Sequence, residues 1–365
     1  MSQDHNFMTH ALGLAARGLG NVWPNPAVGC VVVKNGRVVG RGWTAPGGRP
    51  HAETQALAQA GELARGATAY VTLEPCAHHG KTPPCANALI QSGISRVVCA
   101  ASDPDPRVAG KGFQILREGG IEVVQGVLQD HATLLNRGFF SRVQKNRPLV
   151  TLKLAGSFDG RIATATGESK WITGPYARRR VHAMRANHDA VMVGGGTVRA
   201  DDPSLTVRDL GIDRQPVRVV LSRKLDIPTD GQLGRTAHQH PVWIVHGAEA
   251  PNNLRQAWRK TDAELIELPP HDGWHLDAGL ALSALADRGL TRVFCEGGGA
   301  LAASLLSEGL VDDLIGFTAG RVIGAEGLPQ VGALGLAHLA DAPTFDLVNS
   351  TVVDGDVMHV WRRRD

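Results

Sequence analysis

Three side chains of types that bind zinc lie near a carboxylate in the first quarter of the chain. His51 precedes Glu53 by two residues, and eight residues separate Cys76 from Cys85. Imidazole and thiolate together suit the borderline-soft zinc ion. Three protein ligands leave the fourth position of a tetrahedral zinc free for a water, whose pKa the metal lowers to about 7. The pattern therefore predicts a catalytic zinc site.

Glu53 is predicted to lie in the first turn of a helix that follows His51, where its carboxylate can reach the water without binding the metal. It would take the proton of the water and deliver it to a leaving amine. An H-x-E segment followed by P-C-x-x-C is typical of zinc deaminases that act on nucleobases. Here the longer segment between the cysteines carries His78, His79 and Lys81, which suit contact with a charged substrate.

Three other interpretations stay open. Taken singly, His51 could be a buried polar residue with its hydrogen bonds satisfied, and each cysteine a small core residue. A purely structural zinc would need a fourth ligand, for which His78 or His79 is a candidate. The third is a deaminase of nucleic acids or free nucleosides. A net charge of +3, from 38 Lys and Arg against 35 Asp and Glu, disfavours nucleic acid as the partner.

A second group of candidate residues lies in the other half of the chain. Arg185 and Arg208 flank an Asp-Asp-Pro segment at 201–203, and guanidinium groups suit phosphate oxygens. Further on, an apolar strand runs into three glycines at 297–299 and then a helix, an arrangement that directs backbone N–H groups toward a phosphate. A solvated basic face and a tight turn are the alternative interpretations of these two features.

The surrounding pattern predicts two α/β domains, because 365 residues exceed what one hydrophobic core usually organises. The first half shows a helix over 7–14, a hairpin at Asn35-Gly36, helices over 52–63 and 86–91, and strands over 68–74, 96–101 and 121–127. The polar residues 141–148 are expected to form a linker. The predicted boundary lies near Lys145, which gives domains 1–145 and 146–365.

The second half is predicted to be another layered α/β domain, with short apolar strands separated by helical or glycine-bearing segments. From residue 312 onward the pattern changes to strands with glycine-containing turns, which are expected to be antiparallel. Cys30, Cys99 and Cys295 lie inside apolar runs, where core packing is the expected role.

Composition also bears on location and partners. An odd number of cysteines, five, fits a reducing compartment better than a disulfide framework. The amino terminus has Asp4 and two histidines where a signal peptide carries basic residues, and no run reaches the roughly 18 apolar residues of a membrane span. We expect a cytoplasmic enzyme with no membrane or nucleic-acid partner. A homo-oligomer, with a dimer as its form, is expected by analogy.

The segments PNPAVGCVVVKNG, PHAE, VTLEPCAHHGKTPPC and DPDPRVAGKG resemble the deaminase half of the bifunctional riboflavin-biosynthesis deaminase-reductases. The second half resembles their reductase half, so the resemblance spans essentially the whole chain. It implies an N-terminal cytidine deaminase-like α/β/α domain and a C-terminal dihydrofolate reductase-like α/β domain. The implied reactions are zinc-dependent deamination of a diaminopyrimidinone ribosylamino phosphate and NADPH-dependent reduction of its ribosyl group to ribityl.

The resemblance also implies roles for individual residues. In the deaminase half, Asn25, His78 and Lys81 would contact substrate, and Thr44 stands where family members usually carry a histidine. In the reductase half, Lys153 and Asp201 would lie beside the reacting sugar. Substrate would be held by Ser169, Arg185, Leu205, Arg208 and Glu296. The NADPH site would be lined by Ala155, Trp171, Thr197, Asp201, Gly297, Gly298 and Gly299.

Overall fold

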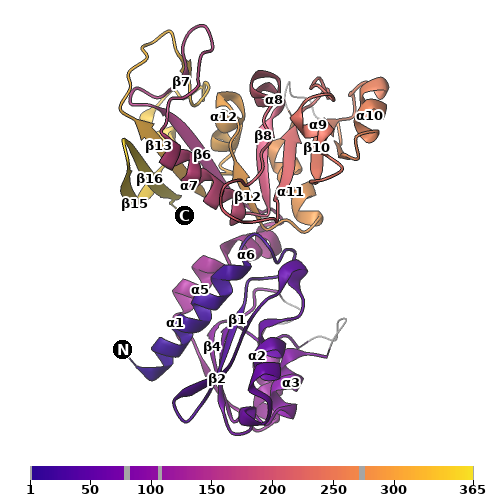
Figure 1. The fold of residues 1–365 in the computed structure, drawn as a ribbon, viewed down its shortest axis with the longest axis vertical. Coiled ribbons are helices and arrows are strands. Elements are labelled where there is room, and N and C mark those ends of the chain that lie inside the picture. The colour runs from indigo at the N-terminus through magenta and orange to yellow at the C-terminus, as the bar shows by residue number, and fades with distance from the viewer. Residues whose placement is uncertain (1, 78–82, 106–108, 271–275, 365) are drawn as a thin grey trace. The chain divides into compact units, whose positions relative to one another are not determined.

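The computed structural model describes residues 2–77, 83–105, 109–270 and 276–364. The chain divides into two compact units, Met1–Asn146 and Arg147–Asp365, so the division falls next to Lys145. Each unit is built on its own sheet, five-stranded in the first and nine-stranded in the second (Figure 1).

The first sheet has the strand order β2-β1-β3-β4-β5. Its strands are β1 (Gly29–Lys34), β2 (Arg37–Trp43), β3 (Thr68–Leu73), β4 (Arg96–Ala101) and β5 (Glu122–Gln125). The predicted hairpin joins β1 to β2, and Asn35 and Gly36 both adopt the positive φ (50° and 74°) that a two-residue turn of this kind requires. Strands β3, β4 and β5 are parallel, so helices must connect them.

Helices cover both faces of this sheet (Figure 1). Helices α1 (Gln3–Ala15) and α5 (Gln129–Leu135) lie on one face, and α2 (Ala52–Ala60), α3 (Cys85–Gln91) and α4 (Lys111–Glu118) on the other. Two glycines let the helices approach closely. A Cβ on Gly29 would lie 1.9 Å from the Ala11 carbonyl oxygen of α1, and one on Gly40 would lie 2.1 Å from that of Ala56 in α2. The second contact sets the height of α2, the helix that carries Glu53, above the sheet.

The predicted linker over 141–148 was wrong for most of its length. Helix α6 (Arg137–Lys145) runs through it, and Phe139 and Phe140 at its start pack against the core of the first unit. The polar residues that suggested a linker belong to an amphipathic helix with one face on the core.

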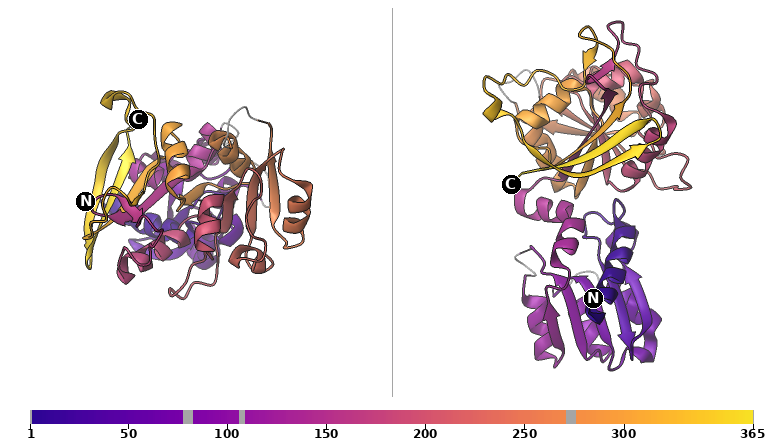
Figure 2. Two further views of the ribbon diagram at one scale, coloured as in Figure 1. Left: turned by 90° about the horizontal axis from the view of Figure 1, so that it is seen from above. Right: turned by 90° about the vertical axis from the view of Figure 1, so that its left-hand side faces the viewer.

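The second sheet has the order β11-β10-β9-β8-β12-β6-β13-β16-β15. Its strands are β6 (Leu149–Ser157), β8 (Ala190–Gly194), β9 (Val217–Leu221), β10 (Val242–Gly247), β11 (Glu264–Leu268), β12 (Arg292–Cys295), β13 (Asp313–Ala319), β15 (Phe345–Val353) and β16 (Asp356–Arg363). The seven strands from β11 to β13 are parallel. The last two, β15 and β16, are antiparallel, as predicted for the end of the chain (Figure 2, yellow). The prediction was wrong for β13, the first strand after residue 312, which pairs parallel with β6.

Helices α7 (Pro175–Ala186), α8 (Gly195–Asp201), α9 (Gln232–Arg235), α10 (Asn252–Arg259), α11 (Ala278–Asp287) and α12 (Gly299–Ser307) complete this unit, with a small pair of strands, β7 (Arg161–Ala163) and β14 (Leu328–Pro329). Helix α8 begins where β8 ends, and the glycines before α12 follow β12, the neighbouring parallel strand. The carboxyl ends of parallel strands meet at one edge of a sheet, where ligands commonly bind in open α/β sheets.

Cys30, Cys99 and Cys295 are fully buried, as predicted for core residues. No helix among the described residues is long and apolar enough to cross a membrane.

Candidate functional sites

The predicted zinc ligands converge in the first unit. His51 caps the amino end of α2, Cys85 is the first residue of α3, and Cys76 lies in the segment between β3 and α3. The His51 Nδ1 atom is 3.3 Å from Cys85 Sγ and 3.7 Å from Cys76 Sγ, and the three donor atoms lie within 4.8 Å of one another. A tetrahedral zinc with Zn–N of about 2.0 Å and Zn–S of about 2.3 Å needs donors roughly 3.5 Å apart. The donor set therefore fits zinc in both chemistry and spacing.

Of the two cysteines, Cys76 is placed where the thiolate form is favoured. The backbone N–H of Cys85 donates to Cys76 Sγ over 3.3 Å. The neighbouring Cys85 thiol and the His51 ring lower the pKa of Cys76. Zinc binds the thiolate form of cysteine, so this environment prepares Cys76 as a ligand.

Glu53 lies beside these ligands in the first turn of α2, as the sequence predicts. Its side chain is only 3% exposed, and burial raises the pKa of its carboxyl group. Together with His51 and Cys76 it lines a cavity of about 290 Å³. A carboxyl group with a raised pKa, beside a cavity large enough for a ring, is suited to accept and return a proton near neutral pH.

Two side chains that also line this cavity hold its wall in place. Asn25, predicted to contact substrate, donates from Nδ2 to the Gly48 carbonyl oxygen over 2.8 Å. Thr44 accepts the Val28 N–H at Oγ1 over 2.9 Å and donates to the Pro26 carbonyl oxygen over 3.0 Å. Thr44 thus fastens the segment that follows Asn25.

Glu74 organises another part of the same wall and was missed from sequence. Its buried carboxylate accepts three backbone N–H groups, from Asp103 (3.3 Å), Gly110 (3.1 Å) and Gly112 (2.9 Å). Asp103 and Asp105 line the cavity alongside it. The only sequence signal was the acidic residue at the end of a strand, directly before the Pro-Cys of the zinc motif. His78, His79 and Lys81 lie outside the described residues, so their predicted roles stay predictions.

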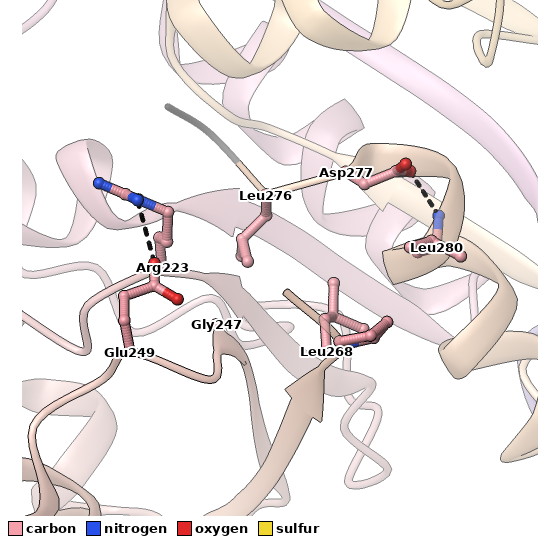
Figure 3. A pocket seen from close by; sticks show the side chains of 8 residues that line it. Arg223, Gly247, Glu249, Leu268, Leu276, Asp277 and Leu280 are labelled. Atoms are coloured by element: carbon pink, nitrogen blue, oxygen red, sulfur yellow. Dashed lines mark hydrogen bonds and ion pairs between the residues drawn. The ribbon is translucent and has the colours of Figure 1, made fainter. Parts of the chain in front are cut away.

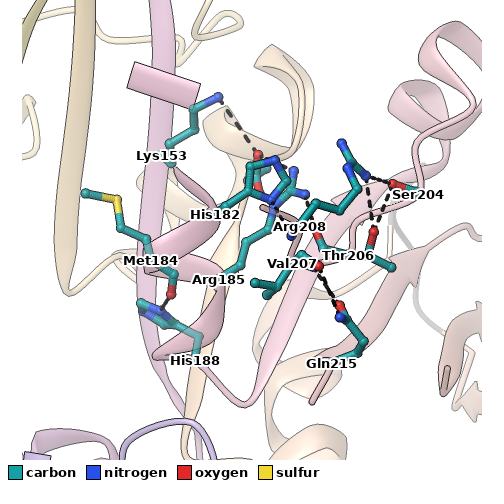
Figure 4. A network of polar contacts seen from close by, with 11 residues as sticks. Lys153, His182, Met184, Arg185, His188, Ser204, Thr206, Val207, Arg208 and Gln215 are labelled. Atoms are coloured by element: carbon teal, nitrogen blue, oxygen red, sulfur yellow. Dashed lines mark hydrogen bonds and ion pairs between the residues drawn. The ribbon is translucent and has the colours of Figure 1, made fainter. Parts of the chain in front are cut away.

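In the second unit the predicted residues form a buried network of charges (Figure 4). Lys153 Nζ of β6 is 3.9 Å from Glu296 Oε2, while Arg185 of α7 binds Glu296 through Nε (2.5 Å) and Nη2 (3.1 Å). Burial lowers the pKa of Lys153, and the carboxylates of Glu296 and Asp201 act against that effect. Burial works to raise the pKa of Glu296, but Arg185 and Lys153 outweigh it and keep the carboxylate ionised.

Two of the predicted cofactor residues, Thr197 and Gly298, meet at the carboxyl edge of the sheet. Thr197 Oγ1 in α8 accepts the N–H of Gly298, which joins α8 to the glycine turn before α12 (3.1 Å). A cavity of about 450 Å³ opens beside this junction. It is lined by Gly194, Gly195 and Gly196, by Leu301 and Ser304 of α12, and by Ser222, Arg223 and Lys224. The last three were missed, although their position directly after an apolar strand is a signal for ligand binding.

A smaller hollow adjoins this cavity and shares Arg223 with it (Figure 3). Arg223 Nη1 pairs with Glu249 over 3.1 Å on one side, and Asp277 caps α11 by accepting the Leu280 N–H on the other (2.8 Å). Its volume of about 20 Å³ suffices for only about one water molecule. The larger cavity is therefore the candidate for a cofactor.

Some predicted residues lie elsewhere. Ser169 and Trp171 line a different hollow, with Val322 and Ile323, and Trp171 as a whole residue is 62% exposed. The Leu205 side chain is buried in the core, so a contact with substrate would have to come from its backbone. Ala155 lies two residues beyond Lys153 on β6 and is half-buried.

Two family models match the chain. The model "Cytidine and deoxycytidylate deaminase zinc-binding region" matches residues 1–101, and the "RibD C-terminal domain" matches residues 148–359. Fold and sites thus define a two-domain protein that joins a zinc-binding deaminase domain to a reductase domain.

Full-length relatives narrow this class. The "Riboflavin biosynthesis protein RibD" of Escherichia coli strain K12 is 42% identical, over 97% of this chain and 98% of the relative. The protein of the same name from Haemophilus influenzae is 44% identical, over 98% of this chain and 96% of the relative. The structure of RibD from Acinetobacter baumannii superposes with a TM-score of 0.89, at 40% identity and 99% coverage of both chains. The chain belongs to the RibD family. The predicted folds, cytidine deaminase-like and dihydrofolate reductase-like, are confirmed.

Proposed function

We propose that this chain catalyses two reactions of riboflavin biosynthesis. The first is the hydrolytic deamination of 2,5-diamino-6-(5-phosphoribosylamino)pyrimidin-4(3H)-one, and the second is the NADPH-dependent reduction of the ribosyl side chain to ribityl. The convergence of His51, Cys76 and Cys85 beside Glu53 carries this proposal. A Thermotoga maritima structure with a TM-score of 0.86 and 38% identity supports it, because that protein is named a diaminohydroxyphosphoribosylaminopyrimidine deaminase and 5-amino-6-(5-phosphoribosylamino)uracil reductase.

In the deaminase domain, His51, Cys76 and Cys85 would hold zinc, which supplies the Lewis acidity that makes water nucleophilic near neutral pH. Glu53 then has the proton-transfer role. Its buried carboxylate takes a proton from the attacking water and delivers it to the departing amine, so the same group serves as base and acid. Asn25 orients the pyrimidine, and His78 and Lys81 contact the ribose phosphate.

In the reductase domain, NADPH supplies the hydride, and the protein binds, orients and moves the accompanying proton. We assign that proton to Lys153. Its ammonium group is buried beside Glu296, and its lowered pKa makes it a better acid toward the sugar oxygen. The negative charge of Asp201 stabilises the protonated ammonium form of Lys153. The remaining roles follow the family. Substrate contacts come from Ser169, Arg185, Leu205, Arg208 and Glu296, and NADPH contacts from Ala155, Trp171, Thr197, Asp201, Gly297, Gly298 and Gly299.

A structural zinc is the second candidate for the metal site. Against it, the described residues offer three ligands, and they adjoin a cavity of about 290 Å³ that a closed four-ligand site would not need. We also propose a cytoplasmic location and a homo-oligomeric state, both by analogy with other soluble biosynthetic enzymes.

The test measures zinc content, ammonia release from the pyrimidine phosphate, and NADPH oxidation after deamination. Glu53→Gln should keep zinc and lose about 10²- to 10⁴-fold in ammonia release, the range for a positioned acid–base group, while still reducing preformed intermediate. Lys153→Met should do the reverse, with ammonia release intact and reduction slowed by about 10²-fold or more. Loss of both activities in either variant with the fold intact would contradict two independent sites. Stoichiometric zinc without ammonia release would favour a structural metal.

A further inference from the structure

The segment over residues 204–208, which joins α8 to β9, presents an arginine prepared for an anion. Arg208 is exposed, and its Nη1 donates to the hydroxyls of Ser204 and Thr206, the latter over 3.1 Å (Figure 4). In the described parts of the chain no carboxylate pairs with this guanidinium. Two neutral hydroxyls therefore orient the group while its charge stays available to a ligand.

Arg185, the neighbouring arginine, already makes hydrogen bonds within the chain through all three of its guanidinium nitrogens. Its Nε and Nη2 bind Glu296, and its Nη1 donates to the Thr206 carbonyl oxygen over 2.7 Å. Arg185 thus ties the 204–208 segment to the Glu296 and Lys153 pair. Whatever contact Arg185 also makes with substrate, its bonds within the chain hold the segment that carries Arg208, whose own guanidinium stays available to an anion.

Two further side chains hold the backbone on which Arg208 stands. The Gln215 side chain binds both backbone polar groups of Val207. It accepts the N–H at Oε1 (2.6 Å) and donates from Nε2 to the carbonyl oxygen (3.1 Å). His182 of α7 accepts the backbone N–H of Arg208 at Nδ1 over 3.2 Å. Leu205 in the same segment has a φ of 54°, which a leucine adopts only where its surroundings enforce it.

The surroundings of His182 suit an acceptor. Burial lowers the pKa of His182, the charges of Arg185 and Arg208 lower it further, and Glu296 opposes them. This lowered pKa disfavours protonation of the ring, in line with Nδ1 accepting the Arg208 N–H.

We propose that His182 and Gln215 are positioning residues that hold the 204–208 segment so that Arg208 binds the phosphate group of the substrate during reduction. This inference rests on the proposed function, because the phosphate belongs to the proposed substrate. It assigns roles to two residues outside the reacting centre. Their effect should appear in phosphate recognition and leave the chemistry at the sugar carbon unchanged.

The experiment compares reduction of the phosphorylated intermediate with reduction of the same compound without its phosphate. For Gln215→Ala and His182→Ala, KM for the phosphorylated compound should rise about tenfold, the effect of loosening one charge-assisted hydrogen bond, with kcat nearly unchanged. KM for the dephosphorylated compound should stay at the value of the unmodified protein. His182→Asn, whose Oδ1 can accept the Arg208 N–H, should restore most of the affinity. Adding Gln215→Ala to Arg208→Ala should cause little further loss beyond that of Arg208→Ala alone.

The kcat for the dephosphorylated compound, a reaction of the same domain, serves as the control for correct folding of each variant and should stay unchanged. Equal rises in KM for both compounds, or a fall in kcat alone, would overturn the proposal, as would His182→Asn behaving like His182→Ala.

A second experiment measures phosphate binding without turnover. Inorganic phosphate should raise the melting temperature of the unmodified protein more than that of Arg208→Ala or Gln215→Ala. If the protein reduces no pyrimidine, the proposed function fails, but the melting-temperature measurement still tests the 204–208 segment. Equal rises in melting temperature with phosphate in all three proteins would refute the role of Gln215 and Arg208 in phosphate binding.

Discussion

The two candidate sites are assembled in different ways. In the first unit, His51 and Glu53 share one helix start, and Cys76 and Cys85 bracket one short segment. In the second unit, Lys153, Arg185 and Glu296 come from β6, α7 and the end of β12, and the 204–208 segment adds Arg208. A metal site needs a few donors around one point, whereas a site for a long cofactor and a phosphorylated substrate must reach many atoms. Local motifs therefore suffice for the first and not for the second.

The sites also differ in how charge is balanced. The Glu53 carboxyl group and the Cys76 thiol are acidic groups in a largely buried space, where a bound cation would stabilise their ionised forms. In the second unit, Lys153 and Arg185 neutralise Glu296 within the chain itself. We therefore expect the first site to depend on its metal and the second to be indifferent to it.

The largest expected effect breaks the first site alone. Cys85→Ser should abolish stoichiometric zinc and reduce ammonia release by at least about 10³-fold, because the metal contributes several kcal/mol to such reactions. Reduction of preformed intermediate should be unchanged. Metal analysis and the two assays measure this. The matched control is Cys99→Ser, which alters a buried cysteine of β4 that is no ligand and should keep its zinc. Zinc and full activity in Cys85→Ser would contradict the assigned ligand set.

An intermediate effect tests whether the first site also depends on distant contacts. Glu74→Gln replaces a carboxylate that accepts three backbone N–H groups, so we expect local opening near Gly110 and Gly112 to become easier by about 2 kcal/mol. Hydrogen exchange of these amides reports it directly. Glu118→Gln is the control, since that exposed carboxylate of α4 bonds, among the described residues, only the Gln114 side chain. Equal exchange in both variants would show that Glu74 does not hold the cavity wall.

The smallest expected effect concerns the second unit. His188 donates from Nδ1 to the Met184 carbonyl oxygen (2.7 Å) and accepts from Thr151 Oγ1 at Nε2 (3.0 Å), and burial lowers the pKa of His188 to about 3 (Figure 4). Below about pH 6.5 the unfolded chain takes up a proton that the folded chain refuses, so stability should fall as pH falls from there toward 3.

Between pH 7 and 5.5 the free energy of unfolding should fall by about 1 kcal/mol, because the unfolded chain binds one more proton than the folded chain over roughly one pH unit. His188→Gln should remove it and flatten the pH dependence of the unfolding midpoint, even if the variant is less stable at pH 7. Replacing the exposed His238 by Gln serves as the comparison. An unchanged slope in His188→Gln would show that His188 does not set the acid sensitivity of this unit.

The sequence alone determined the parts of this protein that depend on neighbours along the chain. The zinc ligands with Glu53, the hairpin at Asn35-Gly36 and the apolar strands could be predicted because motif chemistry, turn conformation and hydrophobic runs are local properties. Two-domain organisation followed from chain length and the repeated α/β pattern.

Only the tertiary structure decided how distant segments complete each site. The residues expected to form a linker are part of helix α6, because Phe139 and Phe140 of that helix pack against the core of the first unit. Glu74 holds the cavity wall because it accepts backbone N–H groups that lie about thirty or more positions later in the sequence. Leu205 faces the core because its backbone adopts a positive φ. Gln215 and His182 matter because they meet the backbone beside Arg208. Such contacts depend on how strands and helices pack, and a hydrogen bond between remote residues leaves no periodicity in the chain from which it could be inferred.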